Sequence, residues 1–242
     1  MAGKRANVRK RRVPTGPIAN QIFIGCPWKT VRPKYITITE RFSKKYPVSF
    51  IIVGKEKEHS AEDLLGLIKG KLESSSGAIF DVSGGNANVS LEFGYAEAMG
   101  VQSALYLNTH QMGTRRGGGA AIISDLAGKR RREYKNEARL SELLGEYTKN
   151  HPFTLRFEQA LRRSLKSASK GAKKRTRALT LKIIHYLDDK ISVRRSDLTN
   201  HILALHNGYK AKEVEQGLKM LHKEGLIKVS EGRYSDVYIF SE

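Results

Sequence analysis

Four short runs of β-forming residues, evenly spaced in the first half of the chain, place the strongest constraint on its fold. The runs are residues 22–24, 48–53, 78–82 and 103–107, and their starts lie 26, 30 and 25 residues apart. That spacing leaves room for a helix between successive strands, which parallel pairing requires. The sequence therefore predicts an α/β domain built on a parallel sheet.

Helix signals fall between these runs. Residues 60–63 place a capping serine before two acids, and apolar residues then repeat at helical spacing over residues 64–72. Residues 89–99 are predicted to form a helix that Gly100 ends. Ligands bind open parallel sheets at the carboxyl ends of the strands, so we expect chemistry in the loops after the four runs.

The segment after the fourth run is predicted to be a loop and then helices. Residues 111–120 contain three consecutive glycines and form a candidate flexible lid. Residues 127–147 and 155–165 have helical patterns, and residues 167–175 are rich in Ser, Ala, Gly and Lys, as in a linker. No internal repeat is found.

After residue 175 the pattern changes. Apolar stripes within residues 179–187, 198–205 and 214–221 predict three short helices, and two β-rich runs, residues 226–229 and 237–240, predict a hairpin. Three helices followed by a hairpin resemble a winged helix-turn-helix. The third helix carries acids that phosphates would repel, so a protein remains an alternative partner to nucleic acid for this part of the chain.

Basic residues are concentrated in two segments. The 242-residue chain has 44 Lys and Arg against 24 Asp and Glu, a formal net charge of +20. Residues 1–20 hold six basic residues and residues 159–182 hold nine, with no acid in either, so these segments supply 15 of the 20 net charges. Such runs bind polyanions by releasing counterions, which favours RNA or DNA over a tail that only solubilises. The candidate nucleic-acid-binding residues are Arg9, Lys10, Arg11, Arg12, Lys173, Lys174, Arg175, Lys212 and Lys219.

Several classes of protein are excluded. No apolar run approaches the roughly 20 residues of a membrane span, and no secretory signal pattern follows the basic N-terminus. Cys26 is the only cysteine, so an intramolecular disulfide is impossible and a cytoplasmic location is favoured. The histidines lack metal-ligand spacing, and both common nucleotide-phosphate glycine motifs are missing. We expect no membrane partner, no metal and no bound cofactor.

Residues 80–96 carry the strongest chemical signal. A strand ends in Asp81, a tight polar loop follows, and the next helix carries Glu92. An acid at a strand end can accept hydrogen bonds from sugar hydroxyls, and Asn88 is either a sugar ligand or the helix cap. A carboxylate at Glu92 can attack an anomeric carbon, or stabilise an oxocarbenium ion, as a base departs.

The pattern Asn-x-Asn-Val-x-x-Glu-x-Gly-Tyr-Ala of residues 86–96 resembles the TIR-like and nucleoside 2-deoxyribosyltransferase-like N-glycosidases. Residues 22–27, Ile-Phe-Ile-Gly-Cys-Pro, are similar to the opening of the TIR-like branch, and residues 124–134 are similar to one of its downstream segments. The resemblance covers about residues 20–150. It implies a flavodoxin-like fold, a catalytic role for Glu92, and cleavage of an N-glycosidic bond in a nucleoside, a nucleotide or NAD as substrate.

The wider setting is also implied by resemblance. Bacterial members of this family are often toxic effectors in antiphage defence. A glycosidase-like domain joined to a winged helix is similar to the effectors encoded beside retron reverse transcriptases. The partner of those effectors is the reverse transcriptase with its multicopy single-stranded DNA. Because TIR-like relatives often complete their sites by assembly, a monomer, a homo-oligomer and a higher assembly all stay open.

Three positions depart from the family pattern. Ala87 replaces a common Pro, Phe93 a common Leu, and Trp28 the usual Phe, while the acid is retained. Trp28 either stacks on a base or packs against the domain. Cys26 has no His placed to activate it, which favours a pocket-wall or core residue. The predicted catalytic residue is Glu92, and the predicted substrate-binding residues are Gly25, Cys26, Trp28, Asp81, Ser83, Asn86, Asn88 and Tyr95.

The predicted organisation has four parts: a basic disordered tail at residues 1–19, a catalytic α/β domain at residues 20–150, a helical basic linker at residues 151–175, and a winged helix domain at residues 176–242. Two other functions compete with the glycosidase. One is a DNA-binding regulator whose α/β domain senses a nucleotide, and the other is a scaffold with a non-catalytic α/β domain. The sequence does not indicate which base leaves. It also leaves open whether water or a second base accepts the glycosyl group.

Overall fold

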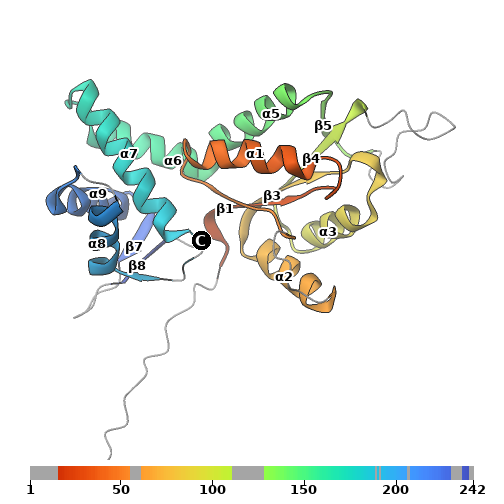
Figure 1. Ribbon diagram of the computed structural model, residues 1–242, viewed down its shortest axis with the longest axis horizontal. Helices are drawn as coiled ribbons and strands as arrows, with labels where there is room; N and C mark the ends of the chain where they lie inside the picture. The colour runs from red at the N-terminus through yellow and green to blue at the C-terminus, as the bar shows by residue number, and fades with distance from the viewer. Residues whose placement is uncertain are drawn as a thin grey trace, which may run out of the picture.

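The described residues of the computed structural model form two halves that lie side by side (Figure 1). They comprise residues 16–54, 61–110, 128–188, 190, 192–205, 208–229 and 236–239. The predicted basic tail, apart from residues 16–19, and the predicted glycine-rich lid at residues 111–120 lie outside them. None of the described helices is long and apolar enough to cross a membrane.

The N-terminal half is built on a five-stranded sheet with the order β2-β1-β3-β4-β5. All four neighbouring pairs are parallel. This is the flavodoxin-like order, in which ligands bind at the carboxyl edge where the strand order reverses, here between β1 and β3. The predicted parallel α/β fold is therefore confirmed. The strands are β1 (Ile18–Gly25), β2 (Ser49–Ile51), β3 (Ser75–Asp81), β4 (Ser103–Asn108) and β5 (Arg131–Tyr134).

Helices cover both faces of this sheet (Figure 1). Side chains alternate along β1, so that Ile22 and Ile24 join one hydrophobic core and Phe23 joins the other. The first core contains α1 (Arg32–Ser43) and α5 (Glu137–Asn150). The second contains α2 (Ala61–Glu73) and α3 (Ala87–Ala98), and Gly100, with φ of +70°, follows α3 as predicted.

A strand stands where the sequence pattern predicts a helix. The prediction of continuous helix over residues 127–147 is wrong, because β5 pairs with β4 and α5 begins only at Glu137. Asn136 caps α5 by accepting a hydrogen bond of 2.9 Å from the Arg139 N–H. Only Tyr134 of β5 is buried. As an edge strand, β5 needs few apolar residues and so gives a weak β signal in the sequence.

Two helices occupy the segment expected to link the domains. In α6 (Pro152–Ser164), Phe153 and Phe157 are buried in the same core as the helices of the C-terminal half. The polar residues after position 169 form the first turns of α7 (Lys170–Leu187), which the Ser169 side chain caps by accepting from the Ala172 N–H. Residues 151–161 thus belong to a packed helix, whereas residues 162–175 are largely exposed and comprise the end of α6, a turn and the first turns of α7. The predicted domain boundaries themselves stay predictions.

The C-terminal half combines helices with a small antiparallel sheet of order β6-β8-β7. The apolar stripes predicted for the three helices, such as Leu179, Leu198 and Leu218, meet in one core. Three helices and a β-rich end agree with the sequence pattern, and the winged helix assignment remains a prediction. The further elements are α8 (Arg195–Leu205), α9 (Ala211–Lys223), β6 (Val193–Arg194), β7 (Ile227–Val229) and β8 (Asp236–Ile239).

Direct contacts join the two halves. Ala19 at the start of β1 is buried in the core of the C-terminal half. The Asn20 amide donates hydrogen bonds to the Pro47 carbonyl at 3.4 Å and to Asp188 Oδ1 at 2.8 Å. The Arg177 guanidinium donates to the carbonyl of Lys45 at 2.9 Å. Strand β1 therefore belongs to the packing of both halves.

We predict that Phe157→Ala destabilises the protein by about 3 to 5 kcal/mol, because it removes a ring that is 0% exposed from the core of the C-terminal half. Leu155→Ala on the same helix is the control, since Leu155 is 46% exposed and should cost less than about 1 kcal/mol. Urea unfolding followed by circular dichroism measures both. Equal, small effects would mean that α6 behaves as a linker.

Candidate active site

A cavity of about 1130 Å³ opens beside the carboxyl ends of β1 and β3. Its walls come from the loops after these two strands and from helices α2 and α3. This is the place where a sheet of this order binds ligands. Of the predicted site residues, the cavity is lined by Cys26, Trp28, Ser83, Asn86, Asn88, Glu92 and Tyr95.

Glu92 projects from the second turn of α3 against the end of β1. A Cβ atom added at Gly25 would lie 2.5 Å from Glu92 Oε2 and 2.7 Å from Phe80 Cδ1. A residue larger than glycine would therefore collide with the carboxylate or with the Phe80 ring. Gly25 makes room for Glu92, which is a structural alternative to the substrate contact predicted for it.

The Glu92 carboxylate is desolvated. Burial raises its pKa to about 7. Within the described part of the chain, it has no hydrogen-bond or ion-pair partner. Near neutral pH the group exchanges a proton readily, and its ionised form keeps both oxygens available to a ligand. A perturbed acid in a cavity is a typical sign of a functional site.

Asp81 is also buried, but its oxygens are hydrogen-bonded within the protein. It is 0% exposed, and its Oδ2 accepts hydrogen bonds from the Tyr35 hydroxyl at 2.9 Å and the Tyr134 hydroxyl at 2.6 Å. Its Oδ1 accepts from the Ser83 N–H at 3.1 Å and from the Ser83 hydroxyl. The pKa of Asp81 is raised, because burial outweighs the four hydrogen bonds that lower it. With its oxygens engaged inside the protein, Asp81 is placed to hold the site together, whereas a sugar contact was predicted.

The loop after β3 is fixed by Ser83 and two glycines. The Ser83 hydroxyl donates to Asp81 and accepts from the Asn108 N–H at 2.7 Å, so it connects the ends of β3 and β4. Gly84 and Gly85 follow with φ of +73° and +61°, a conformation that favours glycine. Ser83 lines the cavity, but its hydroxyl is already engaged in this network.

Asn86, rather than Asn88, caps helix α3. The Asn86 side chain accepts from the N–H groups of Asn88 and Val89 at 3.0 and 3.2 Å. The capping role considered for Asn88 is therefore wrong, because α3 begins at Ala87, before the predicted start. Asn88 is exposed at the helix N-terminus and lines the cavity, where its amide is available to a ligand.

Trp28 lies at the cavity on the loop after β1. Its indole is 48% exposed, with the Arg32 guanidinium 5.3 Å from the ring centroid. A Cβ at Gly54 would collide with the ring, so the indole packs closely against the backbone there. Trp28 is thus partly packed and partly open, and its exposed part can stack on a flat ring.

Cys26 and Tyr95 also line the cavity. Burial is the largest cause that raises the pKa of the Cys26 thiol to about 12, so the group is a neutral wall residue at physiological pH and not a nucleophile. The Tyr95 hydroxyl donates to Glu73 of α2, and Lys69 Nζ lies 5.3 Å from the Tyr95 ring centroid. Tyr95 therefore joins α3 to α2 at the edge of the cavity.

Sequence analysis did not identify Tyr35 or Tyr134 as parts of the site. Both are buried, and each donates to Asp81 across 46 and 53 residues of chain. Tyr35 stands on α1, and Tyr134 ends the strand that was predicted as helix. The one sequence feature that pointed to this region was the similarity of residues 124–134 to the TIR-like branch. That similarity did not indicate which residue Tyr134 contacts.

The predicted nucleic-acid-binding residues have different environments. Arg175 forms a two-point ion pair with Glu213 at 2.6 and 3.0 Å, which lowers the pKa of Glu213 to about 2. Lys219 lies 3.7 Å from Glu215, which also pairs with Arg195. The acids of α9 are thus neutralised within the protein. Lys173, Lys174 and Lys212 are exposed, and Arg9, Lys10, Arg11 and Arg12 lie outside the described residues.

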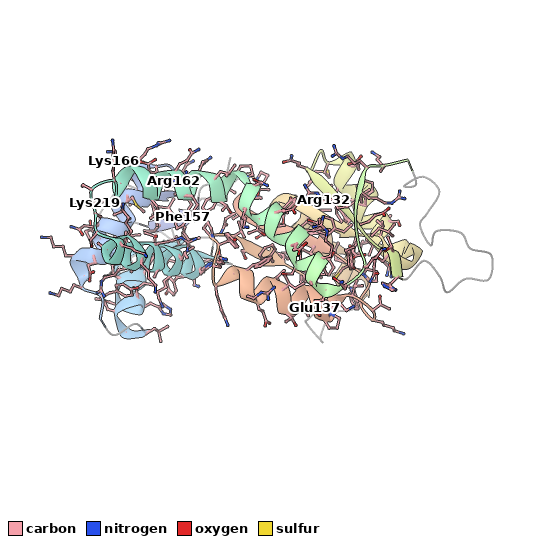
Figure 2. All side chains as sticks on the ribbon, turned by 90° about the horizontal axis from the view of Figure 1, so that it is seen from above. Arg132, Glu137, Phe157, Arg162, Lys166 and Lys219 are labelled. Carbon is pink, nitrogen blue, oxygen red and sulfur yellow. The ribbon has the colours of Figure 1, made fainter. Side chains whose placement is uncertain are left out.

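Figure 2 shows where the labelled basic side chains gather. Arg162, Lys166 and Lys219 lie at one end of the molecule, far from Arg132 and Glu137. Lys219 belongs to α9, Arg162 to the last turn of α6 and Lys166 to the turn after that helix, so these neighbouring segments give the C-terminal half a basic surface. This surface is separate from the candidate active site.

Comparisons with known proteins find similarity among solved structures. No family model matches the chain, and no curated protein matches it. Among solved structures, the chain is similar to a 2-desoxiribosyltransferase from Leishmania mexicana. The two share 16% sequence identity and a TM-score of 0.43, over 55% of this chain and 99% of that one. The fold assignment therefore rests on the order and pairing of the strands themselves.

We predict that Glu92→Gln stabilises the protein above pH 7 by about 1 to 3 kcal/mol. The native pKa of about 7 lies above the ordinary value of 4.5, so the folded protein holds more protons than the unfolded chain between these pH values. The wild type consequently loses stability as the pH rises from 4.5 to 7. The glutamine amide of the variant does not ionise, so the variant does not lose this stability. Thermal unfolding at pH 4.5 and pH 8 measures it.

Glu97→Gln is the matched control on the same helix. Glu97 is exposed and pairs with Lys129 at 2.6 Å, so its replacement should change stability by less than about 1 kcal/mol at either pH. If Glu92→Gln shifts stability equally at pH 4.5 and pH 8, the carboxylate is not desolvated in the way described.

Proposed function

We propose that this chain is an N-glycosidase that cleaves the bond between base and sugar in a nucleoside, a nucleotide or NAD. The observation that carries the proposal is the Glu92 carboxylate, which is desolvated in a cavity at the carboxyl edge of a flavodoxin-like sheet and has no partner among the described residues. The resemblance of residues 86–96 to glycosidases of this kind supports it independently of the cavity.

The chemistry follows from the position of Glu92. As the C1′–N bond breaks, its electron pair leaves with the base, and positive charge develops on the sugar at C1′ and the ring oxygen. The ionised Glu92 either forms a bond to C1′ or stabilises that charge electrostatically. A lone pair of water, or of a second base, then forms the new bond to C1′, the proton that this acceptor loses goes to the departing base or to solvent, and the carboxylate is regenerated.

The other cavity residues supply binding rather than proton transfer. The exposed part of Trp28 stacks on the base, and the Asn88 amide hydrogen-bonds the sugar or a phosphate near the N-terminus of α3. Asp81 acts as a positioning residue through Ser83, which holds the loop that leads into α3. The neutral Cys26 closes the wall beside the sugar.

The same proposal includes a nucleic acid partner that represses or triggers the activity. The basic surface of the C-terminal half and the internal pairing of Glu213 and Glu215 support contact with phosphates. A toxic effector in antiphage defence, held by a nucleoprotein such as a reverse transcriptase with its DNA, is the setting that the domain arrangement resembles. We propose in the same way that this protein is soluble and cytoplasmic, as that setting requires.

We predict that Glu92→Gln lowers base release by at least about 100-fold, because the amide cannot supply negative charge at C1′. The measurement is chromatography of free bases after incubation with NAD, ribonucleosides, deoxyribonucleosides and their phosphates. Glu97→Gln should retain wild-type activity. If the wild type binds one of these ligands without turnover, the chain is a nucleotide sensor, and if Glu92→Gln releases base normally, Glu92 is not catalytic.

A further inference from the structure

A second cavity, a groove of about 1090 Å³, lies between the two halves of the protein. Helix α1 and strand β2 form one side of it, and helices α7 and α8 form the other. Among the described residues, none that lines this groove also lines the candidate active site. The proposed glycosidase chemistry therefore leaves the groove without a function.

Basic side chains outnumber acidic ones around the groove. Residues 174, 177, 178, 181, 182 and 185 recur at helical spacing, so one face of α7 runs along it. Of the two acids, Asp188 already accepts hydrogen bonds from Asn20 and His185, each at 2.8 Å. The excess of positive charge favours an anionic ligand. The basic residues are Lys44, Lys174, Arg177, Lys182 and Lys190, and the acids are Glu40 and Asp188.

These basic residues do not all have the same role. Arg177 donates to Glu158 at 2.8 Å and to the carbonyl of Lys45, so it fixes the wall of the groove. Lys44, at the end of α1, and Lys174, on α7, are exposed. They come from the two opposite sides of the groove, so a chain of phosphates lying in it can contact both.

The groove also offers flat rings. Tyr186 of α7 and His201 of α8 stack with their ring centroids 4.0 Å apart and their planes 29° apart. Both side chains line the groove, and both are only partly buried. Lys190 Nζ lies over the Tyr186 ring, 4.3 Å from its centroid, so a base stacks on this pair from the His201 side. Aromatic rings combined with a basic groove are the features by which proteins bind single-stranded nucleic acid.

We propose that this groove binds a single strand of nucleic acid, with phosphates near Lys44 and Lys174 and a base stacked beside Tyr186 and His201. The groove has a volume of about 1090 Å³, which leaves room for a short segment of a nucleic acid chain. A duplex keeps its bases stacked inside, where these rings cannot reach them. This inference rests on the proposed nucleic acid partner and not on the glycosidase.

The test uses the full chain and a fluorescein-labelled oligodeoxythymidylate of about 12 nucleotides, within the usual site size of such grooves. The variant K44E/K174E should bind about tenfold more weakly in low salt. Its plot of log affinity against log salt should be flatter by about 1.4, the value for two lost phosphate contacts. The control K135E/K149E makes the same charge change at two exposed lysines of the N-terminal half and should bind like the wild type.

Photocrosslinking with a bromodeoxyuridine-substituted strand locates the contact, and we expect adducts on the peptides that contain Tyr186 or His201. If both variants lose affinity equally, or if adducts form only on α9, the groove is not the binding site. The proposal of a nucleic acid partner would not be affected by that result. If a duplex or thymidine monophosphate competes as well as the single strand does, the groove does not select single-stranded nucleic acid, and the proposed class of ligand is wrong. If no oligonucleotide binds, both the groove and the partner are wrong.

Discussion

The four hydrogen bonds accepted by Asp81 are the interaction on which the N-terminal half depends. They bring together Tyr35 on α1, Tyr134 at the end of β5, and Ser83 in the loop after β3. A buried carboxylate without such donors would cost several kcal/mol, so the three elements must close around it. The Ser83 hydroxyl then accepts from the Asn108 N–H, which extends the same network to the end of β4.

This network explains why two neighbouring acids have different properties. Asp81 is fully satisfied and holds the strand ends, whereas Glu92 faces the cavity with a pKa near 7 and no partner among the described residues. Environments that treat two carboxylates so differently are typical of sites where one acid positions and the other reacts. Helix α1 connects this region to the groove, since Tyr35 reaches Asp81 and Ile36 lines the groove.

Local patterns predicted much of this arrangement. Strand spacing indicated the parallel sheet, and the motif around Glu92 indicated the helix that carries it. The partners of Asp81 were not predicted, because Tyr35 and Tyr134 approach it only through the tertiary fold. Strand β5 was missed because its charged residues face solvent at a sheet edge. The cap of α3 was misassigned because Asn86 and Asn88 are both good capping residues, and only the backbone path selects Asn86.

The most direct test of the account is the pH dependence of base release by the wild type, measured as kcat/KM on whichever nucleoside, nucleotide or NAD substrate it cleaves. A reacting carboxylate must be ionised, and burial raises the pKa of Glu92 to about 7. We therefore expect kcat/KM to rise with pH through a midpoint near 7. A rate that is flat from about pH 5 to 9, or a midpoint near the ordinary glutamate value, would contradict it.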